Sequence, residues 1–95
     1  FNMHNITVTI EFDPAKAKAN FRKHRVHFSD AEQVLYDPNA LTHEDPDADG
    51  ESRFVTLGMD SQNRFLVVVY THRGKKIRLI SARKASSGEM EQYHA

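Results

Sequence analysis

Basic side chains gather late in this chain of 95 residues, at a spacing that suits phosphate binding. Residues 61–88 contain seven lysines and arginines and no carboxylate: Arg64, Arg73, Lys75, Lys76, Arg78, Arg83 and Lys84. Such a segment can present a phosphate-binding surface to nucleic acid. It can equally be a solvated hairpin whose charges keep strand edges soluble. Composition alone leaves both interpretations open.

The opposite charge is concentrated just before this segment. Residues 37–51 contain six carboxylates and no lysine or arginine: Asp37, Glu44, Asp45, Asp47, Asp49 and Glu51. The formal net charge of +0 therefore hides a separation of the two signs along the sequence. A basic surface attracts a polyanion or an acidic partner even when the whole protein is neutral.

The chain also contains six histidines, which raises metal-dependent hydrolysis as a rival chemistry. His24 and His27 are spaced like a ligand pair, with Asp30 or Glu32 nearby. The pair falls between two predicted helices, so its imidazoles need not share a face, and no second ligand cluster follows. Support for a metal site is therefore weak, and we predict no metal or other cofactor.

Composition narrows the class of protein further. The length fits a single domain over residues 1–95. The chain has no cysteine, which suits a reducing cytosol. Its longest apolar run, residues 65–70, is far shorter than a membrane span, and the N-terminus lacks a basic leader. We expect a cytoplasmic protein that does not contact the membrane.

The first elements that must position these residues are a strand and a helix. Residues 6–12 alternate apolar and polar side chains, the period of a strand with one buried face. Asp13 then offers an N-cap carboxylate and Pro14 a first helical position that needs no donor. The helix is expected to run to about His24.

A second, shorter helix and a loop follow. Ser29 and Glu32 have the spacing of a capping box for a helix that runs through Tyr36. Pro38 prevents that helix from continuing far. The acidic residues 37–51 are then predicted to form a loop.

The remainder predicts a meander of strands and a terminal helix. Runs rich in β-branched and aromatic residues predict strands over residues 53–59, 64–72 and 75–82. The middle strand is apolar on both faces, so we expect it to be central. Ser86 and Glu89 have the spacing of a capping box for a helix on which Tyr93 can rest against the sheet. The predicted order is β-α-α-β-β-β-α, a small α+β domain with an antiparallel sheet packed by helices.

Two of the basic residues have a predicted place on the last strand. Arg78 lies between Ile77 and Leu79, so alternation puts its side chain on the opposite face, alongside Ile80. A partly covered groove is expected there. Arg83 comes at the end of the same strand, a common location for functional groups.

Short motifs throughout the chain resemble the BrnT family of bacterial toxins. They are Asp13-Pro14-Ala15-Lys16-Ala17, Asn20, Lys23-His24, Phe28-Ser29, Asp37-Pro38, Gly50-Glu51 with Arg53, Leu66-Val67-Val68-Val69 with Thr71, Arg73-Gly74, Ile77-Arg78, Ile80-Ser81-Ala82-Arg83-Lys84-Ala85, Glu89 and Tyr93. Each motif is weak alone, but their order and spacing over nearly the whole chain are specific. One departure is Arg25, where the family usually has a glycine in a left-handed turn. The end of the first helix is therefore expected to be strained or differently shaped.

The resemblance implies an activity and partners. BrnT proteins are similar to the RelE class of toxins, which pack helices against an antiparallel sheet and cut RNA without a metal ion. It implies a metal-independent endoribonuclease of a type II toxin-antitoxin system that inhibits translation. It also implies a BrnA-like antitoxin with a ribbon-helix-helix part, through which alone DNA is contacted. The alternative is a non-enzymatic module whose basic surface receives an acidic partner.

Metal-free RNA cleavage needs groups that stabilise phosphate charge and groups that move protons. Arg53, Arg78 and Arg83 match family positions, and a guanidinium fork suits phosphate oxygens. Glu51 and His24 are the proton-transfer candidates. The predicted substrate contacts are Lys23, Arg73, Lys75, Lys76 and Tyr93. Each has a plainer alternative: surface charge for the arginines, a helix-dipole contact for His24, pairing with Arg53 for Glu51, and helix packing for Tyr93.

Overall fold

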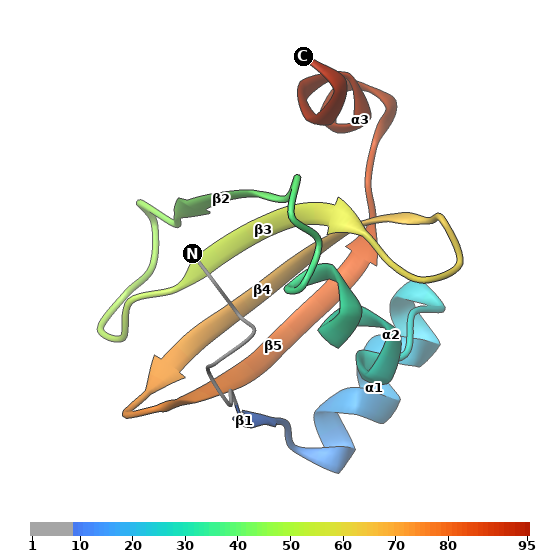
Figure 1. The fold of residues 1–95 in the computed structure, drawn as a ribbon. Coiled ribbons are helices and arrows are strands. Elements are labelled where there is room, and N and C mark those ends of the chain that lie inside the picture. Colours follow the sequence, from blue (N-terminus) through green and yellow to red (C-terminus); the bar gives the residue numbers. More distant parts are fainter. Residues whose placement is uncertain (1–8) are drawn as a thin grey trace.

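The computed structural model describes residues 9–95 as one sheet with three helices (Figure 1). The elements are β1 (Thr9–Glu11), α1 (Pro14–His24), α2 (Phe28–Val34), β2 (Leu41–Glu44), β3 (Phe54–Met59), β4 (Phe65–Arg73), β5 (Lys76–Lys84) and α3 (Ser87–His94). The strand order is β1-β5-β4-β3-β2, and β1 runs parallel to β5 while the other pairs are antiparallel. The predicted α+β class with a mostly antiparallel sheet is confirmed.

The acidic segment differs from its prediction. Residues 41–44 form the edge strand β2 on β3, whereas a loop was expected over residues 37–51. All four residues of β2 are exposed, so no alternation of apolar side chains marks the strand in the sequence. Pairing with β3 creates it, and the Thr42 and Thr56 hydroxyls share a hydrogen bond of 2.8 Å across the pair. Of the first predicted strand, residues 6–8 lie outside the described part of the chain.

Two of the three helices begin at the cap that the sequence predicts. The Asp13 carboxylate accepts from the Ala15 amide at 2.9 Å and starts α1 as predicted, and the capping box that begins α3 is also present. The capping box predicted at Ser29 is wrong. The N-cap is His27, two residues before Ser29, so α2 begins at Phe28 and has no side-chain cap. Burial explains the shift, because Phe28 is only 2% exposed and anchors the first turn in the core.

The end of α1 keeps its left-handed turn although no glycine is present. Arg25 adopts φ 59° and ψ 31°, and its amide donates to the Phe21 carbonyl at 2.8 Å. A left-handed L-residue costs about 1–2 kcal/mol. The Arg25 guanidinium lies 5.6 Å from the centre of the Phe21 ring, and this cation–π contact offsets part of that cost. The exit is therefore strained, as expected, but the turn is not reshaped.

The core lies between the sheet and the two helices that cover one of its faces (Figure 1). Val26, Ala31 and Val34 from the helical layer pack with Leu66 and Val68 of β4, and all five are fully buried. The neighbouring Val67, on the other face of β4, is also buried, at 4% exposed. The predicted central position of this strand is confirmed.

A β-bulge in β5 overturns the regular alternation predicted there. Val69 pairs with Ser81 while Tyr70 pairs with Leu79, which leaves Ile80 as an extra residue. Leu79 and Ala82 consequently both face the core, although they are three residues apart. The same shift brings Arg78 and Arg83 to one face of the sheet, the face opposite α1 and α2. In a regular strand residues five apart point to opposite faces.

The side chain of Asn20 holds β5 just beyond this bulge. Its amide group donates to the carbonyls of Ala82 at 2.9 Å and Val26 at 3.1 Å, and its oxygen accepts from the Ala82 amide at 3.0 Å. Within residues 9–95, β1 pairs with β5 only at residues 76–78. The Asn20 amide therefore replaces a strand partner for the next stretch of β5 and fixes α1 against the sheet.

We expect Asn20→Ala to lower the free energy of unfolding by about 3 kcal/mol, because it leaves buried backbone groups of Ala82 and Val26 without partners. Urea unfolding measures the loss, and amide exchange at Ala82 should become faster. Lys16→Ala, an exposed change on the same helix, should alter stability by less than about 0.5 kcal/mol. A loss below about 1 kcal/mol for Asn20→Ala would contradict this role.

Candidate active site

The open face of the sheet, opposite α1 and α2, carries Arg78 beside Glu11. The Arg78 Nε donates to the Glu11 carboxylate at 3.3 Å, and the two side chains are 35% and 30% exposed. Within residues 9–95 this is the one hydrogen bond that the Arg78 side chain makes. Its two terminal NH₂ groups thus stay available to an oxyanion, while Glu11 fixes the orientation of the guanidinium plane.

Arg53 precedes β3 at the position that lies across the sheet from Arg78, with Thr71 of β4 between them. Thr71 of β4 is the register partner of Arg78, and its hydroxyl donates to the Ser52 carbonyl at 2.6 Å. This bond ties the start of β3 to the row that contains Arg78. Two strand spacings separate the backbones of Arg53 and Arg78, roughly 10 Å. Arg53 is exposed and makes no ion pair with any described side chain, so the two arginines can approach one phosphate from both sides of Thr71.

The hairpin between β4 and β5 adds further charge at this end. Glu51 pairs with Arg73 at 3.6 Å, and both side chains are about half exposed. The alternative in which Glu51 pairs with Arg53 is therefore wrong. Lys76 is the register partner of Arg73 and, two residues before Arg78, shares its face. The structure thus gathers six of the predicted site residues at the hairpin end: Glu51, Arg53, Arg73, Lys75, Lys76 and Arg78.

Arg83 lies at the other end of β5, where its guanidinium is already occupied. It makes a bidentate ion pair with Glu89, with both N–O distances at 2.8 Å. The hydrogen bonds from Arg83 are the largest influence on this carboxylate, and together with the amide of Ser86 they outweigh burial and lower the pKa of Glu89 to about 2. Hydrogen bonding to Glu89 also raises the pKa of Arg83. A phosphate would have to compete with Glu89 for this fork.

Tyr93 attaches α3 to the rest of the molecule. Its hydroxyl donates to the Asp37 carboxylate at 2.8 Å, and its ring meets Phe65 edge-on at a centroid distance of 5.0 Å. The hydrogen bond to Asp37 raises the pKa of Tyr93. Burial alone would raise the pKa of Asp37, but its bonds from Met59, Asn39 and Tyr93 prevail and lower it. These contacts favour the packing interpretation of Tyr93.

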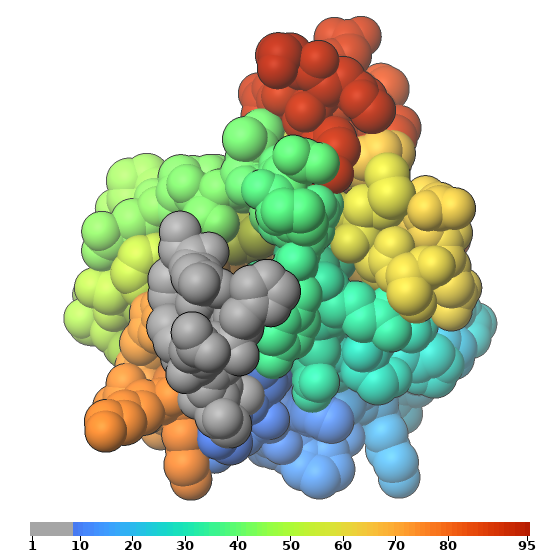
Figure 2. Space-filling view, in the orientation of Figure 1, coloured from blue at the N-terminus to red at the C-terminus, as the bar shows by residue number. Residues whose placement is uncertain are grey.

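Lys23 and His24 also lie toward the Arg83 end. They close α1, and Asn20, one turn before His24, contacts Ala82 next to Arg83. Figure 2 shows the hairpin (orange) and α3 (red) at opposite ends of the molecule. The predicted site residues thus form two groups, and His24 belongs to a different group from Arg53, Arg78 and Glu51.

The folded chain pairs more of the cations of the basic segment, residues 61–88, than the sequence of the segment indicates. Each arginine in residues 61–88 pairs with a carboxylate outside the segment: Arg64 with Asp30 and Asp60, Arg73 with Glu51, Arg78 with Glu11, and Arg83 with Glu89. The absence of carboxylates within the segment therefore does not leave its arginines without ion pairs. Within the segment, only the three lysines, Lys75, Lys76 and Lys84, have no ion pair with a described carboxylate.

The histidine pair is not arranged as a ligand pair. His27 stacks on Phe21 with centroids 4.1 Å apart, and His24 ends α1. No group of three or more potential metal ligands occurs in the described part of the chain. No helix within residues 9–95 has the length and apolar character needed to cross a membrane.

Sequence reasoning missed two residues that organise the site. Glu11 alternates with apolar neighbours in a strand, so the pattern predicts an ordinary solvent-facing residue. No local signal indicates its contact with Arg78, 67 positions later. Asn20 belongs to a motif, but its role depends on a backbone group 62 residues away. Such pairings become visible only in the folded chain.

Comparisons with known proteins agree with this architecture. The sequence matches the family described as "Ribonuclease toxin, BrnT, of type II toxin-antitoxin system" over residues 12–89. The fold is similar to the crystal structure of the Brucella abortus ribonuclease toxin BrnT, with a TM-score of 0.64 and 25% sequence identity. That alignment covers 85% of this chain and 100% of the Brucella chain. No curated protein matches the sequence.

The ion pair of Arg83 with Glu89 should make stability depend on pH in the acid range. Because the folded pKa of Glu89, about 2, is below its ordinary 4.5, the stabilisation is complete above about pH 4.5 and is lost as the pH falls toward 2. Glu89→Gln keeps the capping geometry but removes the charge, so the variant should lack this component. Thermal unfolding from pH 7 to pH 2 measures the difference. Parallel pH profiles for the two proteins would contradict it.

Proposed function

Because the chain belongs to the BrnT family of ribonuclease toxins of type II toxin-antitoxin systems, we propose that it cleaves RNA without a metal ion on the open sheet face around Arg78. As a member of this family it acts on RNA and has a cognate antitoxin. Membership of a ribonuclease family favours this function over a purely non-enzymatic binding module. Cleavage of RNA that is being translated would stop protein synthesis.

The observation that supports the proposal most is that the Arg78 guanidinium makes a single hydrogen bond to a described side chain. Glu11 holds it through Nε alone, so both terminal NH₂ groups can donate to the non-bridging oxygens of a phosphate. Arg53 adds a second cation from the other side of Thr71. Negative charge grows on these oxygens when the phosphorus becomes five-coordinate, so donors already in place stabilise the transition state more than the substrate.

The proton transfers fall to groups near this pair. We assign Glu51 as the base that takes the proton of the ribose 2′-hydroxyl, whose oxygen then attacks phosphorus. The bond to the 5′-oxygen breaks, and this oxygen leaves with a proton taken from solvent, so a 2′,3′-cyclic phosphate and a 5′-hydroxyl end result. Lys76, on the same face as Arg78, adds positive charge at the phosphate. No step in this scheme requires a metal ion.

The second group of residues serves the flanking RNA rather than the reacting phosphate. Arg83, Lys23 and His24 lie toward the far end of β5, roughly 13 Å along the strand from Arg78. Glu89 occupies the Arg83 guanidinium, and Lys23 and His24 lie on α1 at the other face of the sheet, so we place none of them at the phosphate held by Arg78. We assign these residues to contacts with neighbouring nucleotides, together with Tyr93, Arg73 and Lys75 as weaker contacts.

We further propose that the antitoxin is BrnA-like, with a ribbon-helix-helix part that alone contacts DNA. An acidic segment of such a partner on the open sheet face would block Arg78 directly and silence cleavage. The cysteine-free chain suits action in the cytoplasm, where both RNA and the antitoxin are found.

We expect Arg78→Lys to lower the rate of RNA cleavage by about 10² or more, because lysine keeps the charge but loses the fork that donates two bonds to one phosphate. Arg83→Lys should have a smaller effect, since Glu89 already occupies that guanidinium. Single-turnover cleavage of a labelled RNA by the purified toxin measures both rates, and thermal unfolding confirms that each variant is folded.

Added EDTA should leave the parent rate unchanged. If Arg78→Lys cleaves RNA at the rate of the parent, Arg78 is not part of the reaction centre, and Arg53 and Glu51 become the candidates to test. Loss of cleavage in EDTA would overturn the metal-free mechanism while leaving the ribonuclease activity in place.

A further inference from the structure

The cations without ion pairs are concentrated on a helix that the proposed reaction centre does not use. Between Asp13 and Asp30 the chain contains five lysines and arginines and no carboxylate: Lys16, Lys18, Arg22, Lys23 and Arg25. None of the five makes an ion pair within residues 9–95. α1 with its cap therefore carries five cations without an ion pair, more than the three lysines without one in the basic segment of β4 and β5.

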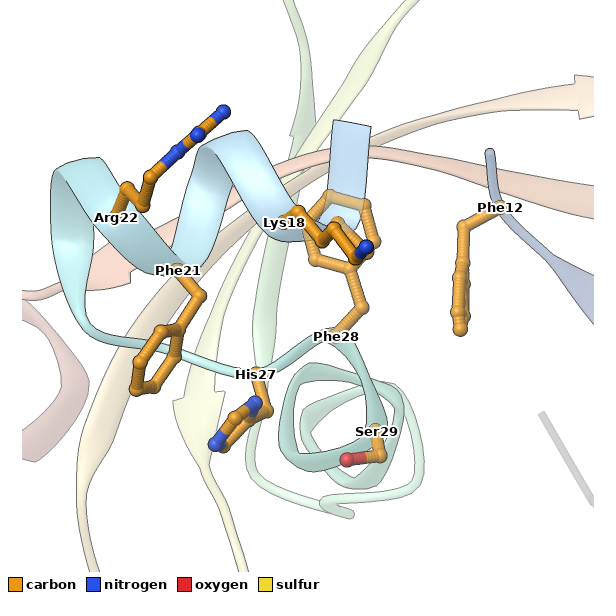
Figure 3. A pocket seen from close by; sticks show the side chains of 8 residues that line it. Phe12, Lys18, Phe21, Arg22, His27, Phe28 and Ser29 are labelled. Carbon is orange, nitrogen blue, oxygen red and sulfur yellow. The ribbon is translucent and has the colours of Figure 1, made fainter. Parts of the chain in front are cut away.

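Beside this helix the structure has a cleft of about 410 Å³ between the end of β1, α1 and the start of α2. Its walls include Phe12, Phe21 and Phe28 and the imidazole of His27. Lys18 and Arg22, both exposed, lie at its rim. Figure 3 shows the aromatic rings around the opening, with the Lys18 side chain extending from α1 over them and the Arg22 side chain pointing outward from the same helix.

The rings offer flat surfaces for stacking. His27 lies almost parallel to Phe21, with an interplanar angle of 16° and centroids 4.1 Å apart. His27 is exposed and caps α2 without a side-chain hydrogen bond, so the fold does not use its nitrogens for that cap. Phe12 meets Phe28 edge-on at 5.4 Å and closes the other side of the cleft.

We infer that this cleft is a nucleotide subsite, in which one base of single-stranded RNA stacks on the exposed His27 ring at the aromatic wall while Lys18 and Arg22 bind adjacent phosphates. Stacking on aromatic side chains combined with a positive groove is the physical basis of single-strand binding, and it tolerates any base sequence. The inference deepens the proposed function and rests on it in one respect, that RNA is the natural polyanion.

Size and charge favour a nucleotide over a segment of a protein. A cleft of about 410 Å³ is in the range of small-molecule sites. A docked amphipathic helix instead needs a groove that takes anchors over two or more turns. The rim carries cations and no carboxylate, so it complements phosphates without any rearrangement.

The cleft adjoins the same edge strand as the proposed reaction centre, because Phe12 at the end of β1 lines it. Phe12 directly follows Glu11, the residue that holds Arg78 on the open face. β1 is the edge strand of the sheet, and the two sites lie on either side of it. A strand of RNA that passes around this edge would meet the cleft on one face and Arg78 on the other.

The phosphate contacts can be tested with a fluorescent 2′-deoxy oligonucleotide, which cannot be cleaved because it lacks the attacking hydroxyl. Titration of the full chain at several salt concentrations gives the slope of log affinity against log salt. Lys18→Gln with Arg22→Gln should reduce the magnitude of that slope by about 1.4, since each phosphate contact on a single strand contributes about 0.7. Lys16→Gln, which removes equal charge per residue from the same helix but does not line the cleft, should keep the parent slope.

The base contact can be tested with oligonucleotides that carry an abasic site at successive positions. The parent should show one position where loss of the base weakens binding about 5- to 150-fold, the size of one base stacked on an aromatic ring. His27→Ala should remove that position dependence, whereas His43→Ala, an exposed histidine on β2, should retain it. Circular dichroism confirms that the variants are folded.

The outcomes separate this inference from the proposed function. If the parent cuts RNA but the cleft variants bind as the parent does, the subsite is wrong and the ribonuclease assignment stands. If the parent cuts no RNA yet binding depends on the cleft, the subsite stands and the proposed function fails. Unchanged oligonucleotide binding with loss of antitoxin affinity would make the cleft a protein-docking site and overturn the inference, as would a parent that does not bind the oligonucleotide.

Discussion

The three hydrogen bonds of the buried Asn20 side chain connect almost every feature of this fold that matters for function. They join α1 to the backbone of β5 at Ala82 and to the segment that leads into α2 at Val26. β5 is bulged at Ile80, and the pairing of β1 with β5 that the structure describes ends at Arg78, so it supplies no strand partner for Ala82. By occupying the backbone groups of Ala82, the amide of Asn20 holds in place the stretch of β5 that follows the bulge, and the bulge places Arg78 and Arg83 on one face. It also sets the spacing between α1 and α2, and therefore the width of the aromatic cleft.

Ion pairs between distant segments decide which cations can meet a substrate. Arg64 bridges Asp30 and Asp60 and stabilises the turn before β4, and Arg83 secures the start of α3 through Glu89. The guanidinium groups of these two arginines are occupied by ion pairs that stabilise the fold. Arg78 is held by one bond only, and the cations of α1 are not paired with any described carboxylate. Positive charge available to RNA therefore lies on the open sheet face and along α1, with the edge strand β1 between them.

Much of the fold could be predicted because its signals are local. The alternating strands, the Asp13-Pro14 start of α1, the capping box of α3 and the central place of β4 follow from patterns within a few residues of each other. The errors have one cause in common. β2 exists because β3 offers it backbone partners, α2 begins at Phe28 because the core buries that ring, and the bulge at Ile80 depends on its neighbours in the sheet. None of these influences is local in the sequence.

The sequence by itself determined the family resemblance, the α+β class and the residue types that metal-free RNA cleavage requires. Only the tertiary structure decided how these residues are grouped. It joined Glu11 to Arg78 and Glu51 to Arg73, separated His24 from the arginines near the hairpin, and placed Phe12, Phe21 and His27 around one cleft. The physical reason is that charge pairing and ring packing act over a few ångströms in space, whatever the separation along the chain. A sequence records which groups are present, and the packing of the folded chain determines which of them are close enough to act together.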